Sequence, residues 1–111
     1  MPKFLVQGSY GPGGAQAILK EGASARRAAV EKAVTNLGGT LEAFYFAFGD
    51  VDLYVIMELP NTTAAIAASL FTNASGTVSA KTTVLILPEE VDAAAKMDIG
   101  YRPPGADRMT R

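Results

Sequence analysis

The sequence predicts an α+β domain built on one four-stranded antiparallel sheet with its helices on a single face. The first observation is an aromatic hairpin pattern from Thr40 to Leu59. The second is a pair of helical patterns on either side of the hairpin, and the third is a strand pattern near each end of the chain. The order is strand, helix, strand, strand, helix, strand and a short terminal helix, and right-handed crossovers put both main helices on one face. This is the ferredoxin-like βαββαβ plait with an extra C-terminal helix.

The hairpin is the strongest local signal in the chain. Two runs of aromatic and β-branched residues flank Gly49 and Asp50, a pair typical of a two-residue turn. With that turn, Tyr45 lies opposite Tyr54, and the register follows by counting outward. One face is then apolar throughout and holds Phe44, Phe46, Phe48, Val51, Leu53, Val55 and Met57. The other is amphipathic and holds Ala43, Tyr45, Ala47, Asp52, Tyr54 and Ile56.

The residues before the hairpin predict one strand and one long helix. Lys3 to Tyr10 alternates as a strand does, and the glycine cluster at 11–14 reads as a loop before a turn or two of helix at 15–20. Ser24 predicts the N-cap of a helix from Ala25 to about Leu37, which a glycine pair ends. The apolar stripe of this helix consists of Val30, Ala33, Val34 and Leu37.

The residues after the hairpin predict a small-residue helix, a strand and a short helix. The helix runs from about Thr63 to Asn73, and its alanines would let it lie close to the sheet while larger residues supply bulk, namely Ile66, Leu70 and Phe71. Thr77 to Leu87 alternates as the fourth strand, and Pro88 starts a helix that reaches about Lys96. Residues 1–100 are expected to form one domain and residues 101–111 a tail, of which the last six are expected to be loose.

Composition points to a soluble, self-associating protein. Ten basic and eleven acidic residues give a net charge of -1, with no basic stripe for nucleic acid and no charge run for a membrane surface. The 111-residue chain is 49 % hydrophobic and 19 % charged, so part of the apolar excess is expected to face a partner subunit. We therefore expect a homodimer or a higher homo-oligomer that binds neither nucleic acid nor membrane. We also expect it in the cytoplasm, because its N-terminus does not resemble a signal peptide.

The absence of cysteine and histidine narrows the possible chemistry. Without cysteine there are no disulfides, thiolate metal sites or cysteine nucleophiles, and without histidine the commonest general base is missing. No metal site and no cofactor are expected. Whether the protein is an enzyme stays open.

The amphipathic sheet face carries the prediction of assembly. Helices cover only one face of a plait, so the face with Tyr45, Tyr54 and Ile56 must meet water or another molecule. Two such sheets packed face to face form a dimeric α+β barrel, which is the predicted architecture.

Several separated motifs resemble the GYD domain family over nearly the whole chain. They are Gly8-Ser9-Tyr10, Lys20-Glu21-Gly22 with Ala25-Arg26-Arg27, Gly38-Gly39, the run 42–49, Lys81-Thr82-Thr83 and the run 101–105. The resemblance implies a dimeric α+β barrel and a family without a settled biochemical function. The family pattern of glycine, aromatic and aspartate falls on Gly49, Val51 and Asp52, with valine where the family usually has tyrosine. Any role that needs a phenol there is therefore in question for this chain.

Two charged residues on the amphipathic face are candidate site residues. Asp52 could act as a general base or orient a ligand, or it could make a turn-side hydrogen bond or an ion pair at a subunit interface. Lys81, in the fourth strand, could be a base, a Schiff-base nucleophile or an anion anchor. The alternative for Lys81 is an ion pair with Asp52 of the same or a neighbouring subunit, since a lone buried ammonium is costly.

Arg26 and three tyrosines complete the candidate set. Arg26 opens the long helix, where a cation opposes the helix dipole, so it is expected to pair with a carboxylate or to bind an anionic ligand. Tyr10, Tyr45 and Tyr54 could form pocket walls, or they could pack at an interface with bonded hydroxyls.

Three functional hypotheses follow. The first is a homo-oligomeric structural or interaction module without chemistry of its own. The second is a small-molecule binding protein or cofactor-free enzyme whose pocket lies between the open sheet face and the partner, lined by Tyr45, Asp52, Tyr54 and Lys81; it rests on analogy of fold. The third is a nucleotide-binding regulator that uses the glycine cluster and Arg26, although that cluster lacks the spacing of known phosphate loops.

Overall fold

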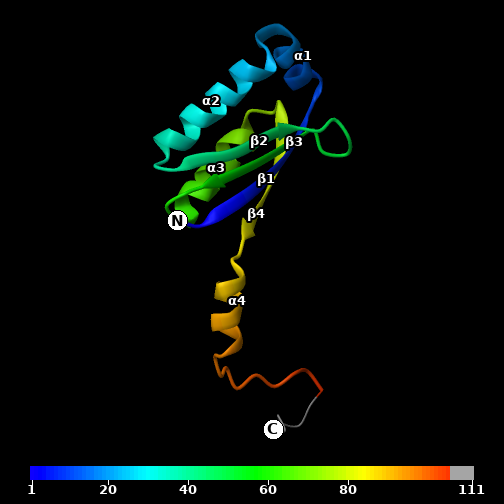
Figure 1. The fold of residues 1–111 in the computed structure, drawn as a ribbon. Coiled ribbons are helices and arrows are strands. Elements are labelled where there is room, and N and C mark those ends of the chain that lie inside the picture. The colour runs from blue at the N-terminus through cyan, green and yellow to red at the C-terminus, as the bar shows by residue number, and fades with distance from the viewer. Residues whose placement is uncertain (106–111) are drawn as a thin grey trace.

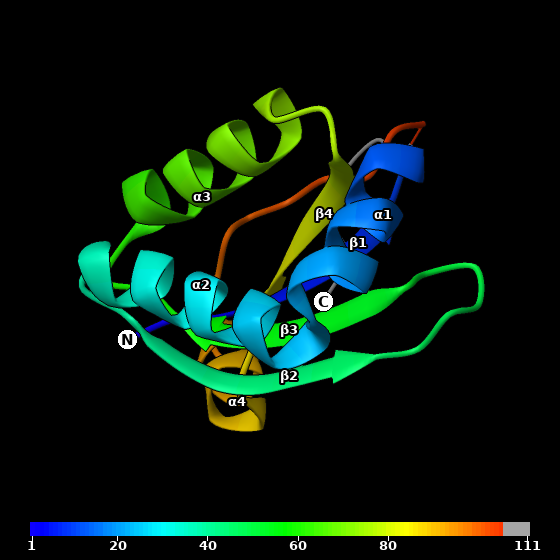
Figure 2. The same ribbon diagram turned by 90° about the horizontal axis from the view of Figure 1, so that it is seen from above.

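A computed structural model describes residues 1–105 of the protein. Within these residues the strands form one antiparallel sheet in the order β2-β3-β1-β4, with β1 at Lys3–Tyr10, β2 at Thr40–Phe46, β3 at Leu53–Glu58 and β4 at Val78–Leu85. The helices in the same residues are α1 at Pro12–Glu21, α2 at Ala23–Asn36, α3 at Thr62–Ala74 and α4 at Pro88–Ala95. Both α2 and α3 lie over the same face of the sheet, and α4 stands away from it (Figure 1, Figure 2). The ferredoxin-like plait with a C-terminal helix is confirmed.

The hairpin register is right, but its turn is not the predicted one. Tyr45 lies opposite Tyr54 and Phe46 opposite Leu53, as counted from the sequence. The two strands nevertheless end at these last residues, and residues 47–52 form a longer loop in which the Ala47 N–H donates to the Asp52 carbonyl at 2.8 Å. A bulge at residue 42 shifts the far end by one residue, so that Leu41 pairs with Met57 and also packs against the core.

The first two helices, α1 and α2, begin at residues other than those predicted. The glycine cluster is not a loop, because Pro12, Gly13 and Gly14 form the first turn of α1. Ser24 is not an N-cap, because α2 already begins at Ala23 and its cap is Gly22 at φ 94°, a backbone conformation that suits glycine. The two helices thus meet at one glycine, and α1 is longer than expected.

Helix α3 packs on the sheet with its small residues, and the predicted large ones remain mostly exposed. Ala64 and Ala65 are buried, whereas Ile66, Leu70 and Phe71 are 52 %, 64 % and 80 % exposed. Alanine allows a close approach of helix to sheet, which leaves no room for the bulky side chains beneath α3. The prediction that these three residues fill the core is wrong.

The core is small and lies mainly over β1 and β3. Its buried members are Phe4, Val34, Leu53, Val55, Met57, Leu59, Ala64 and Ala65. Figure 2 shows α2 on the β2 side of the sheet and α3 on the β4 side. A hollow lined by residues of both helices lies between them.

Two further observations concern membrane-spanning helices and the last residues of the chain. Among the described residues, no helix combines the length and the apolar character that a bilayer span requires. The six residues that were expected to be loose, 106–111, lie outside the described part of the chain.

Candidate functional site

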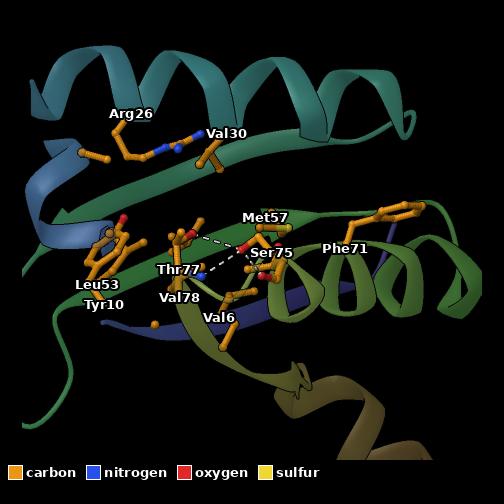
Figure 3. Close-up of a pocket in the computed structure, with 16 residues that line it drawn as sticks. Val6, Tyr10, Arg26, Val30, Leu53, Met57, Phe71, Ser75, Thr77 and Val78 are labelled. Carbon is orange, nitrogen blue, oxygen red and sulfur yellow. Dashed lines mark hydrogen bonds between the residues drawn. The ribbon is translucent and has the colours of Figure 1, made fainter. Parts of the chain in front are cut away.

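A cleft of about 330 Å³ lies between the helix layer and the sheet. Its floor is apolar and comes from the strands, mainly from Val6, Leu53, Val55 and Met57. Its walls come from α1, α2, α3 and the segment that leads into β4 (Figure 3). A second hollow of about 380 Å³ continues along α2 and α3 and shares Arg26, Val30, Met57, Phe71 and Thr72 with the first. The apolar face of the sheet is therefore only partly covered by the chain's own helices.

Arg26 contributes the charged group that borders this cleft. It lies near the start of α2, and its side chain extends beneath the helix toward Val30 (Figure 3). One guanidinium nitrogen lies 3.7 Å from Glu21 Oε1, a long ion pair at the α1–α2 junction. The Nε atom is buried and has no hydrogen-bond partner within residues 1–105. A buried donor without an acceptor is unusual, and it marks a place where an acceptor would be stabilised.

Tyr10 forms the end of the cleft where β1 passes into α1. Its ring stacks on Phe46 with 6.4 Å between centroids. Burial raises the pKa of the Tyr10 phenol, and the nearby positive charge of Arg26 acts in the opposite direction. The neutral hydroxyl is therefore the form that faces the cleft at physiological pH, and it is a hydrogen-bond donor near the guanidinium.

Gly14 makes this placement of Tyr10 possible. A Cβ atom at Gly14 would overlap the carbonyl oxygen of Thr77 and would lie 2.8 Å from the Tyr10 ring. Glycine thus lets α1 approach both the aromatic ring and the segment before β4. Close packing therefore explains why position 14 is a glycine. The sequence alone could also have explained this glycine as part of a phosphate-binding loop.

Asp52 is a structural anchor for the same region. Its Oδ2 accepts a hydrogen bond from the Tyr10 backbone N–H at 2.9 Å, and its own N–H donates to the Gly8 carbonyl at 2.9 Å. The carboxylate therefore ties the hairpin loop to the end of β1. Of the roles that the sequence offered for Asp52, a hydrogen bond made from the hairpin loop is the one that this geometry contains.

Three hydroxyl residues of the cleft were not singled out from the sequence. Thr72 and Ser75 come from the end of α3, and Thr77 follows Gly76 at φ 76°. The Ser75 hydroxyl lies 2.7 Å from the Thr72 carbonyl oxygen and 3.1 Å from Thr77 Oγ1 (Figure 3). The sequence signal was the change from an apolar helix to a polar Ser-Gly-Thr segment, which is equally typical of an ordinary helix end.

A family comparison covers the elements that build this cleft. A family model described as the GYD domain matches residues 4–95, from the first strand through the last helix. The chain belongs to the GYD domain family. A search of curated proteins and a search of solved structures each returned no match. Family membership supports the fold. It indicates no activity, because the family has no assigned function.

The open face of this GYD domain holds the other candidate residues. Tyr45, Tyr54 and Lys81 lie in one row across the sheet, with Gln7 between Tyr54 and Lys81. This row is on the face opposite to the cleft, so Tyr10 and Arg26 do not meet it. Within residues 1–105, Lys81 makes no ion pair, and Asp52 instead bonds the Tyr10 backbone. Pairing of Lys81 with Asp52 of a neighbouring subunit stays a prediction.

Among the described residues, the structure offers little for two other kinds of ligand, a metal ion and a phosphate. No group of three or more acidic side chains in residues 1–105 is arranged to hold a metal ion. At the start of α1, the Gly11 N–H donates to the Thr77 carbonyl at 3.0 Å, and Pro12 has no N–H. Two positions that would supply donors to a phosphate there are thus already used or lacking.

Proposed function

We propose that the cleft binds a small, mostly apolar molecule with an acidic group, and that the protein works as a homo-oligomer. The observation that carries the first part is the buried, unpaired Nε of Arg26 at the border of an apolar cleft. A carboxylate would accept from this guanidinium in a charge-assisted hydrogen bond, which is about twice as strong as a neutral one. The Tyr10 hydroxyl would be a second donor from the sheet side.

The size and lining of the cleft set limits on the molecule. A volume of about 330 Å³ is at the lower end of the range of about 300–1,000 Å³ typical of ligand pockets. The floor offers aliphatic side chains and one thioether, which favour an aromatic or alicyclic body of one or two rings. The lining contains no carboxylate and the chain has no histidine, so we propose binding and assign no general base.

The ligand proposal is tested with pairs of compounds that differ only in charge. Aromatic carboxylates and their primary amides are titrated into the protein, and binding is followed by calorimetry or by the thermal shift. We expect the carboxylates to bind at least tenfold more tightly than the amides. Arg26→Gln should remove this difference, whereas Arg27→Gln, at the neighbouring and exposed position, should keep it. Equal behaviour of the two arginine variants, or no binding of either compound class, would contradict the proposal.

The oligomeric part of the proposal rests on the open sheet face. Tyr45 is 70 % exposed and Tyr54 is 38 % exposed in the single chain, and Leu5 and Ile56 lie in the adjacent row. A second copy packed on this face would shield these side chains and would form the dimeric α+β barrel expected from the sequence. A further pocket between the two faces, lined by Tyr45, Tyr54 and Lys81, belongs to the same proposal. We keep the cytoplasm as the proposed location.

Sedimentation measures this assembly directly. The unmodified protein should sediment as a dimer or larger species at micromolar concentration. Tyr45→Glu should lower the sedimenting mass by breaking the contact between the sheet faces, because a carboxylate would be buried in that interface. Leu19→Glu, at an 87 % exposed position of α1 on the other side of the molecule, is the control and should leave the mass unchanged. A single-chain mass for the unmodified protein would overturn the proposal.

A further inference from the structure

The chain ends in an apolar segment that its own body does not cover. Every residue from 86 to 105, here called the C-terminal arm, is exposed. The large apolar side chains of the arm are between 53 % and 76 % exposed, and they are Ile86, Leu87, Val91, Met97, Ile99 and Tyr101. Helix α4 has eight residues, which is too short for a helix to be stable alone in water. The arm therefore requires a surface to pack on.

The connection between β4 and α4 keeps the arm away from its own domain. Only Ile86 and Leu87 separate the two elements, and Pro88 restricts Leu87 to the extended conformation observed at φ -73° and ψ 147°. The Leu87 N–H also donates to Glu90 Oε1 at 2.9 Å, and the Glu90 N–H donates to the Leu87 carbonyl at 3.0 Å. These contacts fix the first turn of α4, and the arm projects from the sheet end (Figure 1). In the single chain the arm therefore lies away from the α2–α3 groove.

A complementary surface exists on the helix layer of the domain. The groove between α2 and α3 has alanine-rich walls, made by Ala29 and Ala33 on one side and by Ala67 and Ala68 on the other. Small side chains leave space for larger ones inserted from outside, as in ridge-and-groove packing. Phe71 borders the groove and is 80 % exposed, so a covering segment would shield it.

The charge of the C-terminal arm is complementary to the charge beside this groove, and it is not complementary to that of the open sheet face. The arm has four acidic and two basic residues, a net charge of -2, with three of the acids in α4. Helix α2 has three basic residues and one acidic residue, a net charge of +2, and α3 has no charged residue. The charged residues of the open face, Lys3, Glu42, Glu58 and Lys81, sum to zero. Complementary charge directs association toward the surface of opposite sign.

We propose that the C-terminal arm of one copy of this chain lies in the α2–α3 groove of a second copy. Val91 and the apolar residues around it face the alanine walls, and the acidic turn of α4 lies toward the basic residues of α2. A two-fold axis makes the exchange reciprocal, so each copy covers the groove of the other. The arm then closes the outer part of the groove above the deeper cleft. This inference does not depend on the ligand proposed for that cleft.

The natural absence of cysteine makes the contact testable by cross-linking in the full-length chain. Val91→Cys and Ala68→Cys are made separately, tagged differently, unfolded and refolded together, and treated with a short bismaleimide. The matched control replaces Ala68→Cys by Leu19→Cys, an exposed position of α1 outside both the groove and the open sheet face. We expect the 91–68 heterodimer to form at least tenfold faster than the 91–19 product. Equal rates, or a faster reaction with position 19, would overturn the groove assignment.

Two further measurements exclude the remaining alternatives. A chain with both Val91→Cys and Ala68→Cys should cross-link between chains, and a product confined to one chain would refute exchange. Reversal of charge with Asp92→Lys should weaken association at least fivefold at low salt, and combination with Lys32→Glu should restore it. Lys20→Glu on α1 is the control partner and should give no rescue. Failure of Lys32→Glu to restore association would contradict the proposed orientation of α4.

Discussion

Two adjacent glycines in the first turn of α1 should respond in opposite directions to the same substitution. Gly13 has no atom within 4 Å of the position that a Cβ would take. At Gly14 the added Cβ would overlap the Thr77 carbonyl oxygen and would lie 2.8 Å from the Tyr10 ring. Gly13→Ala should therefore stabilise the fold by about 0.5–1 kcal/mol, because alanine loses less backbone entropy in a helix.

Gly14→Ala should destabilise the fold despite the same gain in helix propensity. Overpacking costs about 1–3 kcal/mol, and the upper value applies because a backbone carbonyl cannot rotate away. After the propensity gain of about 1 kcal/mol, a net loss of about 2 kcal/mol remains. For a domain of this size, that loss lowers the Tm by about 8–16 °C.

Urea denaturation followed by circular dichroism measures both variants. All samples need the same protein concentration, because association contributes to the stability of an oligomer. The reasoning would be refuted if Gly14→Ala matched Gly13→Ala or exceeded the unmodified protein in stability. Such a result would mean that α1 does not lie against Tyr10 and Thr77.

Further substitutions test the Asp52 hydrogen bond, the pKa of the Tyr10 phenol and the packing of the buried core. Asp52→Ala should lower the free energy of unfolding by about 1–3 kcal/mol because it leaves the Tyr10 N–H without an acceptor, while Asp52→Asn keeps an acceptor and should lose less in the same urea assay. In an absorbance titration at alkaline pH, a tyrosine transition above pH 10.0 should disappear in Tyr10→Phe, because burial raises the pKa of the Tyr10 phenol above 10.0. The stability from the neutral phenol is then complete below pH 10.0 and is lost as the pH rises through the raised pKa, so Tyr10→Phe should lose less stability there. Leu59→Ala should cost about 2–5 kcal/mol, since Leu59 is 1 % exposed, whereas Leu19→Ala should stay within about 0.5 kcal/mol in a denaturation series.

The sequence predicts the parts of the fold that depend on neighbouring residues. The register of Tyr45 with Tyr54, counted from the predicted turn, holds although the turn differs, because the apolar residues of both strands must share a face. Strand β4 alternates as its residues suggest. The hairpin turn could not be derived in this way. Its shape depends on the Asp52 carboxylate reaching the Tyr10 N–H, a contact between residues 42 positions apart.

The cleft could not be predicted from local sequence patterns for a similar reason. The composition of α3 allows either its alanines or its larger residues to face the sheet, and only the close approach of helix to sheet decides for Ala64 and Ala65. Arg26 was identified as a residue in need of an acceptor, but its position beside Tyr10 depends on the α1–α2 junction at Gly22. The candidate residues therefore divide between two faces: Tyr10 and Arg26 lie at the cleft, and Tyr45, Tyr54 and Lys81 lie on the open sheet face.

Three apolar surfaces of the chain remain uncovered, each for its own structural reason. Helix α3 uses its smallest residues against the sheet, so its larger residues remain outside and a groove remains beside it. The open face lacks a helix layer because the plait has crossovers on one side only. The arm projects from the sheet end and covers neither surface in the single chain. Under the proposed exchange, copies of this chain would bury these surfaces against one another and would supply both the arm and the grooves that receive it.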